Sequence, residues 1–183
     1  NGRSIYERLK LIRSHGRIEE YPSNYFFSIS SPIYIMPGYN FRLSNILAAL
    51  GVSQIKKVEK IIEMRRRNAH KLSKYLSKIK HVKPPREPPT SRHVYQLYTV
   101  RVPSNLRDKL MLYLASKGIM SKVYFSPVHK VPFYRELLSQ NNSLPVTEKV
   151  SREVLSLPMF PSMSDEEISY IARAFRSFFE NVQ

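Results

Sequence analysis

The stretch from Ser44 to Lys80 is the longest uninterrupted pattern in the sequence, and it contains no proline. Serine commonly caps helix N-termini, and apolar residues follow at steps of three and four, the spacing of one helix face. A helix of this length would extend about 55 Å, so we expect it to kink, to break or to link two bodies. The apolar series is Ala48, Gly51, Ile55, Val58, Ile62, Ala69, Leu72, Leu76 and Ile79, interrupted at Arg65.

The segment KPPREPP, residues 83–89, ends that helix because four prolines in seven residues suit neither a helix nor a central strand. Beyond it, short strand-like and helix-like patterns follow one another, which predicts a mixed α/β (α+β) fold. We expect four parts: 1–43 as a leading segment, 44–80 as a connecting helix, 81–92 as a Pro-rich linker and 93–183 as a small α/β domain. The expected shorter elements are helices over 4–15, 104–117, 132–138, 147–157 and 164–182, and strands over 93–102 and 119–125.

Composition narrows the functional classes. The chain has no Cys, which excludes disulfides, thiolate nucleophiles and Cys-based metal sites, and no second His lies at metal-ligand spacing from His129. Hydrophobic residues make up 42% of the chain, enough for a core. No apolar stretch has the length of a membrane span and no signal-peptide pattern is visible, so we expect a cytoplasmic protein with no metal and no membrane partner.

The net charge of +16, from 30 Lys+Arg against 14 Asp+Glu, favours an anionic partner. Its densest run is KKVEKIIEMRRR, residues 56–67, where the basic positions mostly lie off the apolar stripe, as on any solvated helix face. No zinc-finger, homeodomain or RNP-type pattern accompanies them. Nucleic-acid binding therefore ranks last among the functions that we consider.

Two places could bind a ligand. Asn40 and Arg42 precede the long helix two residues apart, so in an extended segment both side chains would face one anion beside the helix N-terminus. The alternative, which local chemistry favours, is a turn at Asn40 and a surface salt bridge at Arg42. His129 lies in a loop between two proline-containing turns and is either a site residue or a surface histidine. No GxSxG, P-loop or GxGxxG is present.

The segment GYNFRLSNILAALGVSQIKKVEKIIEMRRRNAHKLSKYL, residues 38–76, resembles a signature of the DegT/DnrJ/StrS family of aminotransferases. The family pattern is roughly G-Y-N-x-R-[ML]-[ST]-x-[IL]-x-A-A-[IL]-G-x-x-Q-[IL], and nearly every fixed position is matched. The resemblance continues in order through VYQLYTVRV, YLASKGI, SPVHKVPFY, LPVTEKVSREVLSLPMFPSMSDEEI and the closing helix, and it includes ERLKLIRSHGR near the start.

This resemblance implies the small C-terminal domain and long connecting helix of a fold-type-I enzyme that uses pyridoxal phosphate to aminate nucleotide-linked keto-sugars from an amino donor. It implies a homodimer in which Asn40 reaches the cofactor phosphate of the other subunit, with Arg42 supporting that phosphate or the substrate. His129 and Tyr134 would contact the nucleotide-sugar. Family members often carry His where this chain has Tyr124 and Gln96, so no substrate contact is assigned to those two.

In this family the large domain, with the Schiff-base Lys and the Asp that pairs with the pyridine nitrogen, lies before the matched region. We therefore expect no catalytic residue in this chain, no cofactor bound by it alone and transamination only with the missing part. The alternatives are a stand-alone binding or assembly module of the same fold and a basic nucleic-acid-binding protein. Without the large domain, Ile55, Val58, Ile62 and the aromatics of 25–27 would be under-covered, which favours dimerisation or helix exchange.

Overall fold

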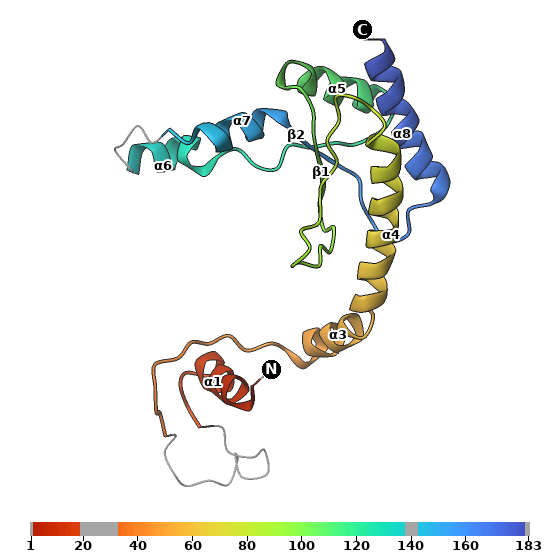
Figure 1. Cartoon of the computed structure of the whole chain (residues 1–183). Helices are drawn as coiled ribbons and strands as arrows, with labels where there is room; N and C mark the ends of the chain where they lie inside the picture. Colours follow the sequence, from red (N-terminus) through yellow and green to blue (C-terminus); the bar gives the residue numbers. More distant parts are fainter. Residues whose placement is uncertain (1, 19–32, 138–142, 182–183) are drawn as a thin grey trace. The chain divides into compact units, whose positions relative to one another are not determined.

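The computed structural model describes residues 2–18, 33–137 and 143–181, and the chain divides into two compact units, residues 1–56 and 57–183 (Figure 1). The expected division into four parts stays a prediction. None of the helices in the described ranges is long and apolar enough to cross a membrane. The aromatics of 25–27 lie outside the described residues.

The first unit contains α1 (Arg3–Arg13), α3 (Asn45–Ile55) and a segment that folds back between them. Residues 33–41 run antiparallel to the end of α1 and the turn that follows it, with isolated β-bridges from Ser14 to Asn40 and from Arg17 to Tyr34. Backbone hydrogen bonds of 2.7 to 3.0 Å join the two segments along this length. The bridges fix which residues of 33–41 lie opposite the end of α1.

Two glycines make this close crossing possible. Gly16 has a φ of +73°, and a Cβ atom there would lie 1.6 Å from the carbonyl oxygen of Met36. A Cβ on Gly38 would lie 2.1 Å from the backbone nitrogen of Gly16. Any side chain at either position would collide with backbone, so the pairing of the two segments requires glycine at both.

The run over 44–80 forms two helices rather than one. Ser44 caps α3, accepting a hydrogen bond from the Leu47 amide, as expected. The helix stops at Lys56, and α4 (Val58–Leu76) begins after Lys57, whose φ of −102° and ψ of −9° depart from α-helical values. The break allowed by the length argument is confirmed, but neither Pro nor Gly marks its position, and α4 also ends before Lys80.

The second unit is built around a two-stranded antiparallel sheet of β1 (Tyr98–Arg101) and β2 (Val154–Leu157), in which Tyr98 pairs with Leu157 and Arg101 with Val154. Helices α4, α5 (Ser104–Ser116) and α8 (Asp165–Glu180) surround the core, and α4 lies beside α8 (Figure 1). The fully buried large side chains are Tyr98, Phe175, Leu72, Leu76, Leu110, Leu114, Leu155, Ile168 and Val100. The predicted mixed α/β fold is confirmed.

Two expected elements differ from the structure. The helix expected over 147–157 is α7 (Pro145–Glu153) followed directly by strand β2, because Val154–Leu157 find a hydrogen-bonding partner in β1. The strand expected over 119–125 contributes one bridge, from Lys122 to Ser156. The 3₁₀ turn η1 (Val128–Lys130) and α6 (Pro132–Leu137) complete the second unit.

Polar contacts tie the Pro-rich segment and the loop before α8 to α4. The guanidinium of Arg66 donates to both carboxylate oxygens of Glu87, at 2.6 and 3.0 Å, and to the carbonyl of His93 at 2.8 Å. The amide of Asn68, which is fully buried, donates to the carbonyls of Phe160 and Pro161 at 3.0 and 3.1 Å. Each contact satisfies polar groups that would otherwise be shielded from water without a partner.

Candidate functional site

The structure brings Asn40 and Arg42 together on one side of an extended segment. The rings of Tyr39 and Phe41 stack with their centroids 4.9 Å apart and an interplanar angle of 12°. Side chains alternate along extended backbone, so this stack places the odd-numbered residues on one side and Asn40 and Arg42 on the other. This is the arrangement that the sequence predicts for an anion site.

Ser14 lies at the centre of this arrangement. Its backbone pairs with Asn40 across the β-bridge, and its buried hydroxyl accepts a hydrogen bond of 3.3 Å from Nη2 of Arg42. The bond orients the guanidinium yet uses only one of its five N–H donors. Arg42 thus does not make the surface salt bridge of the simpler interpretation, because its partner is a buried serine and the described residues give it no acidic partner.

The chemistry of this cluster suits a phosphate group. Arg42 offers a planar fork of donors and Asn40 a neutral amide donor, and both residues are exposed. Helix α3 begins three residues after Arg42, and the first amides of a helix have no partner within it. We call Ser14, Asn40 and Arg42 the N-terminal cluster.

A second cluster surrounds His129 in the other unit. Nε2 of His129 lies 3.2 Å from Oε1 of Glu148, and the ammonium of Lys130 donates to Oε2 of the same carboxylate at 2.6 Å. The amide of Leu144 donates to Oε1 at 3.3 Å. The His129 side chain is 9% exposed, so it is not the surface histidine of the simpler interpretation.

Glu148 is the electrostatic centre of this second cluster. Its hydrogen bonds from Lys130 and His129 lower the pKa of its carboxyl from 4.5 to about 2, so it is an anion at neutral pH. Helix α6, which carries Tyr134, packs against η1, which carries His129. Tyr134 is 43% exposed, and its ring lies edge-on to Phe133 with the centroids 5.2 Å apart. We call His129, Lys130 and Glu148 the histidine cluster.

The two positions where the sequence departs from the family pattern line one cavity. Gln96 and Tyr124 both border a space of about 550 Å³ in the second unit. Its remaining walls are largely apolar, formed by Leu97, Met111, Ala115, Gly118, Ile119, Met120, Ser121, Lys122, Ser156, Leu157, Pro158 and Met159. Gln96 and Tyr124, which are far apart in the sequence, thus line the same largely apolar cavity.

Sequence reasoning missed Ser14 and Glu148. Ser14 directly follows the last residue of α1 and lies two residues before Gly16, whose φ is positive. A glycine at such a turn is a signal that another backbone segment passes close by. Glu148 follows Leu144 by four residues at the start of α7, a spacing that a capping contact explains as well as a site does. Among the residues described, no group of three or more His, Asp and Glu could hold a metal ion.

The sequence and the fold both match known proteins. The model of the DegT/DnrJ/EryC1/StrS aminotransferase family matches residues 1–176. The pleiotropic regulatory protein of Geobacillus stearothermophilus is 30% identical over 184 residues, which cover 99% of this chain and 46% of that protein. GDP-perosamine synthase of Escherichia coli O157:H7 is 30% identical over 145 residues, covering 79% of this chain and 38% of the enzyme.

Among solved structures, Helicobacter pylori PseC, an aminotransferase involved in the biosynthesis of pseudoaminic acid, superimposes with a TM-score of 0.81. The alignment covers 99% of this chain and 47% of PseC at 23% sequence identity, which shows a shared fold. The chain therefore spans less than half the length of each of these relatives.

Proposed function

Because the chain belongs to the DegT/DnrJ/EryC1/StrS aminotransferase family, we propose that it is the C-terminal part of a pyridoxal-phosphate-dependent enzyme that aminates a nucleotide-linked keto-sugar. The observation that carries this proposal is the match of the family model over residues 1–176, together with a sugar-nucleotide enzyme, GDP-perosamine synthase, among the relatives. The share of the relatives that the chain covers supports a partial enzyme.

The N-terminal cluster is proposed to hold the cofactor phosphate of the partner subunit in a homodimer. Arg42 would bind phosphate oxygens through donors that Ser14 leaves free, and Asn40 would add an amide hydrogen bond. The first turn of α3 favours the same negative charge. Ser14 acts through Arg42, because its buried hydroxyl limits the directions that the guanidinium can take.

The histidine cluster is proposed to contact the nucleotide-sugar. If Nε2 of His129 donates to Glu148, Nδ1 is left as an acceptor for a sugar hydroxyl. Glu148 would then set the tautomer and the orientation of the ring rather than touch the substrate. Tyr134, on the neighbouring helix α6, would supply an exposed hydroxyl to the same ligand.

The part of the enzyme beyond this chain is proposed to supply the catalytic lysine. When bound, pyridoxal phosphate supplies the electron sink for amino-group transfer, and a lysine and an acidic partner of the pyridine nitrogen are needed to use it. None of the sites described above contains such a pair. The contribution of this chain is therefore to bind the cofactor phosphate and to position the substrate.

The test is reconstitution. The 183-residue chain is mixed or co-expressed with a lysine-bearing large domain of the same family. Visible absorbance of bound pyridoxal phosphate is measured together with amination of a nucleotide-linked keto-sugar. We expect no cofactor band from the chain alone and both signals from the mixture. Failure of a well-folded mixture would overturn the proposal in favour of a stand-alone binding or assembly module. Salt-sensitive binding of DNA would instead favour a basic nucleic-acid-binding protein.

A further inference from the structure

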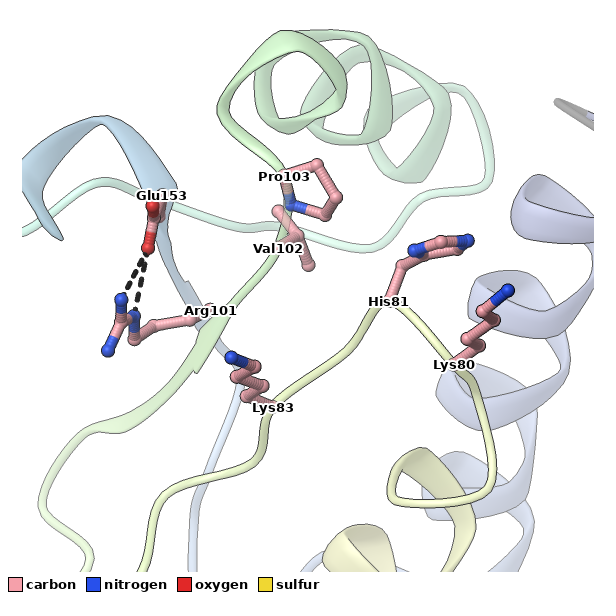
Figure 2. Close-up of a pocket in the computed structure, with 7 residues that line it drawn as sticks. All are labelled: Lys80, His81, Lys83, Arg101, Val102, Pro103 and Glu153. Carbon is pink, nitrogen blue, oxygen red and sulfur yellow. Dashed lines mark hydrogen bonds and ion pairs between the residues drawn. The ribbon is translucent and has the colours of Figure 1, made fainter. Parts of the chain in front are cut away.

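We propose that the loop after α4 forms a binding site for a small polyphosphate compound. The site lies wholly within the second unit and shares no residue with the N-terminal cluster or the histidine cluster. It therefore does not depend on the proposed function. Its residues form a cavity of about 210 Å³, shown in Figure 2, lined by Lys80, His81, Lys83, Arg101, Val102, Pro103 and Glu153.

The loop turns its basic residues outward because two apolar residues, Ile79 and Val82, hold it against the core. Val82 is 5% exposed and belongs to the core, and Ile79 packs against that core. Lys78, Lys80 and Lys83, each next to Ile79 or Val82 in the sequence, are exposed. The loop geometry is fixed by hydrogen bonds from the Ile79 amide to Leu76 and from the Val82 amide to Ile79, both 3.0 Å.

A backbone bridge brings a fourth cation to this loop. Lys83 and Arg101 exchange two backbone hydrogen bonds, of 2.8 and 2.9 Å, as an antiparallel pair. Residues directly opposite in such a pair project on the same side, so the ammonium and the guanidinium share one face. Figure 2 shows Lys83 beside Arg101, with His81 and Lys80 farther back along the loop.

The acidic groups present do not balance this charge. Oε2 of Glu153 accepts from Nε and Nη2 of Arg101, at 3.0 and 2.6 Å, and Arg101 is the main cause of the lowered pKa of that carboxyl. Glu153 is the only acid lining the cavity against two lysines and an arginine. No hydrogen bond or ion pair to the described residues occupies the Lys80 or Lys83 ammonium groups.

Two arginines of the basic run on α4 make contacts that Lys80 and Lys83 lack. There, Arg66 is paired with Glu87, and Arg65 donates to the carbonyls of Tyr95 and Gln96. Arg92, which faces the same helix, is paired with Glu59 and Glu63. Arg65 and Arg66 are therefore engaged by residues of the same unit, whereas the described residues give the ammonium groups of Lys80 and Lys83 no hydrogen bond or ion pair.

A second cavity indicates that the ligand carries more than one phosphate. Lys80 and His81 also border a space of about 390 Å³ whose other walls are Lys78, Ile79, Arg176, Phe179 and Glu180. The two cavities thus share Lys80 and His81 in their walls, and each has further cations in its lining. A ligand with phosphates in series fits this arrangement better than a single phosphate, because each cavity can hold one of its charges.

The test is calorimetric titration of the full chain with sodium tripolyphosphate at low and at physiological salt. We expect binding that weakens with salt, and about tenfold weaker binding in the Lys80→Gln/Lys83→Gln variant, because two of the cations facing the ligand are lost. The matched control is Lys60→Gln/Lys109→Gln, which removes two exposed lysines elsewhere and should change the affinity by less than about twofold. Circular dichroism establishes that each variant is folded.

Three results would overturn the site. They are no binding by the folded chain, equal weakening in the two double variants, and loss of binding in Lys83→Arg, which keeps the charge. Inorganic phosphate is titrated in parallel, and affinity equal to that of tripolyphosphate would contradict the assignment of a ligand with several phosphates. A single-stranded oligonucleotide that binds through Lys80 and Lys83 when tripolyphosphate does not would make this a nucleic-acid surface instead.

Discussion

Arg66 holds Glu87 through two parallel hydrogen bonds, and the backbone amide of His93 donates a third to the same carboxylate at 2.8 Å. The bond from Arg66 is the main cause of the lowering of the Glu87 pKa from 4.5 to about 2. The KPPREPP segment, residues 83–89, is thereby attached to α4 through the ionised carboxylate of Glu87. Its attachment should therefore depend on pH.

We expect Glu87→Gln to destabilise the second unit most at neutral pH. The folded-state pKa of Glu87 lies below its ordinary value, so its contribution is complete above about pH 4.5 and is lost as the pH falls toward about 2. The difference in unfolding free energy between wild type and variant should shrink over that range in urea titrations followed by circular dichroism. Glu136→Gln, at an exposed position on α6, is the control. A difference independent of pH would contradict the prediction.

Asn68→Leu should destabilise the second unit by about 1–3 kcal/mol, because the carbonyls of Phe160 and Pro161 lose the donor that the buried amide of Asn68 supplies. Equilibrium unfolding in urea measures the change. The same substitution at the exposed Asn105 should cost less than about 0.5 kcal/mol. Equal effects at the two positions would show that the buried amide is not the cause.

In the reconstituted enzyme, Asn40→Ala should weaken pyridoxal phosphate binding about tenfold, the size expected for one hydrogen bond to a charged group. Arg42→Lys keeps the charge but loses the planar fork and the bond to Ser14, and it should also weaken binding. Equilibrium dialysis of the cofactor gives the affinities. Unchanged affinity in both folded variants would remove the N-terminal cluster from the cofactor site.

Glu148→Gln should disturb His129 without unfolding the core. The amide side chain cannot attract Lys130 as the carboxylate does, and the pair that orients the imidazole is weakened. We expect a higher KM for the nucleotide-sugar in the reconstituted enzyme with a smaller change in kcat. Faster amide hydrogen exchange at Val131 and Arg135, next to η1, should accompany it. An unchanged KM with altered exchange would indicate a purely structural role.

Self-association should involve α3. Ile46, Leu50 and Ile55 on this helix are 83%, 56% and 72% exposed, and apolar surface of that extent is costly in water. Sedimentation of the chain should therefore depend on its concentration, and Leu50→Glu should shift it toward the monomer. Gln54→Glu adds the same charge at another exposed position of α3 and should have a smaller effect. A monomer at all concentrations would contradict the expected dimer.

The sequence predicted the elements whose signals are local. The helices expected over 164–182 and 104–117 are α8 and α5, and their ends carry local signals: Ser164 forms a capping box with Glu167, and Gly118, with a φ of +72°, follows α5. The exposure expected at Ile55 and Val58 is confirmed, at 72% and 41%, whereas Ile62 is half-buried. The dimer meant to cover them stays a prediction.

The sequence failed where partners distant along the chain decide the structure. Val154–Leu157 became a strand because β1 lies beside it, and a helical pattern over one segment cannot reveal that. The assignments of Asn40, Arg42, His129 and Tyr134 came from resemblance and stay predictions. The structure adds Ser14 and Glu148, whose importance arises only from contacts 28 and 19 residues away.

The pairing of Lys83 with Arg101 has a consequence for engineering. Like charges directly opposite on neighbouring strands lower stability, and Glu153 offsets only part of this one. Replacing Lys83 with threonine or glutamate should therefore raise the melting temperature of the protein. If the loop after α4 binds polyphosphate, the same substitution would weaken that binding. Lys83 would then be a position where thermal stability and ligand affinity oppose each other.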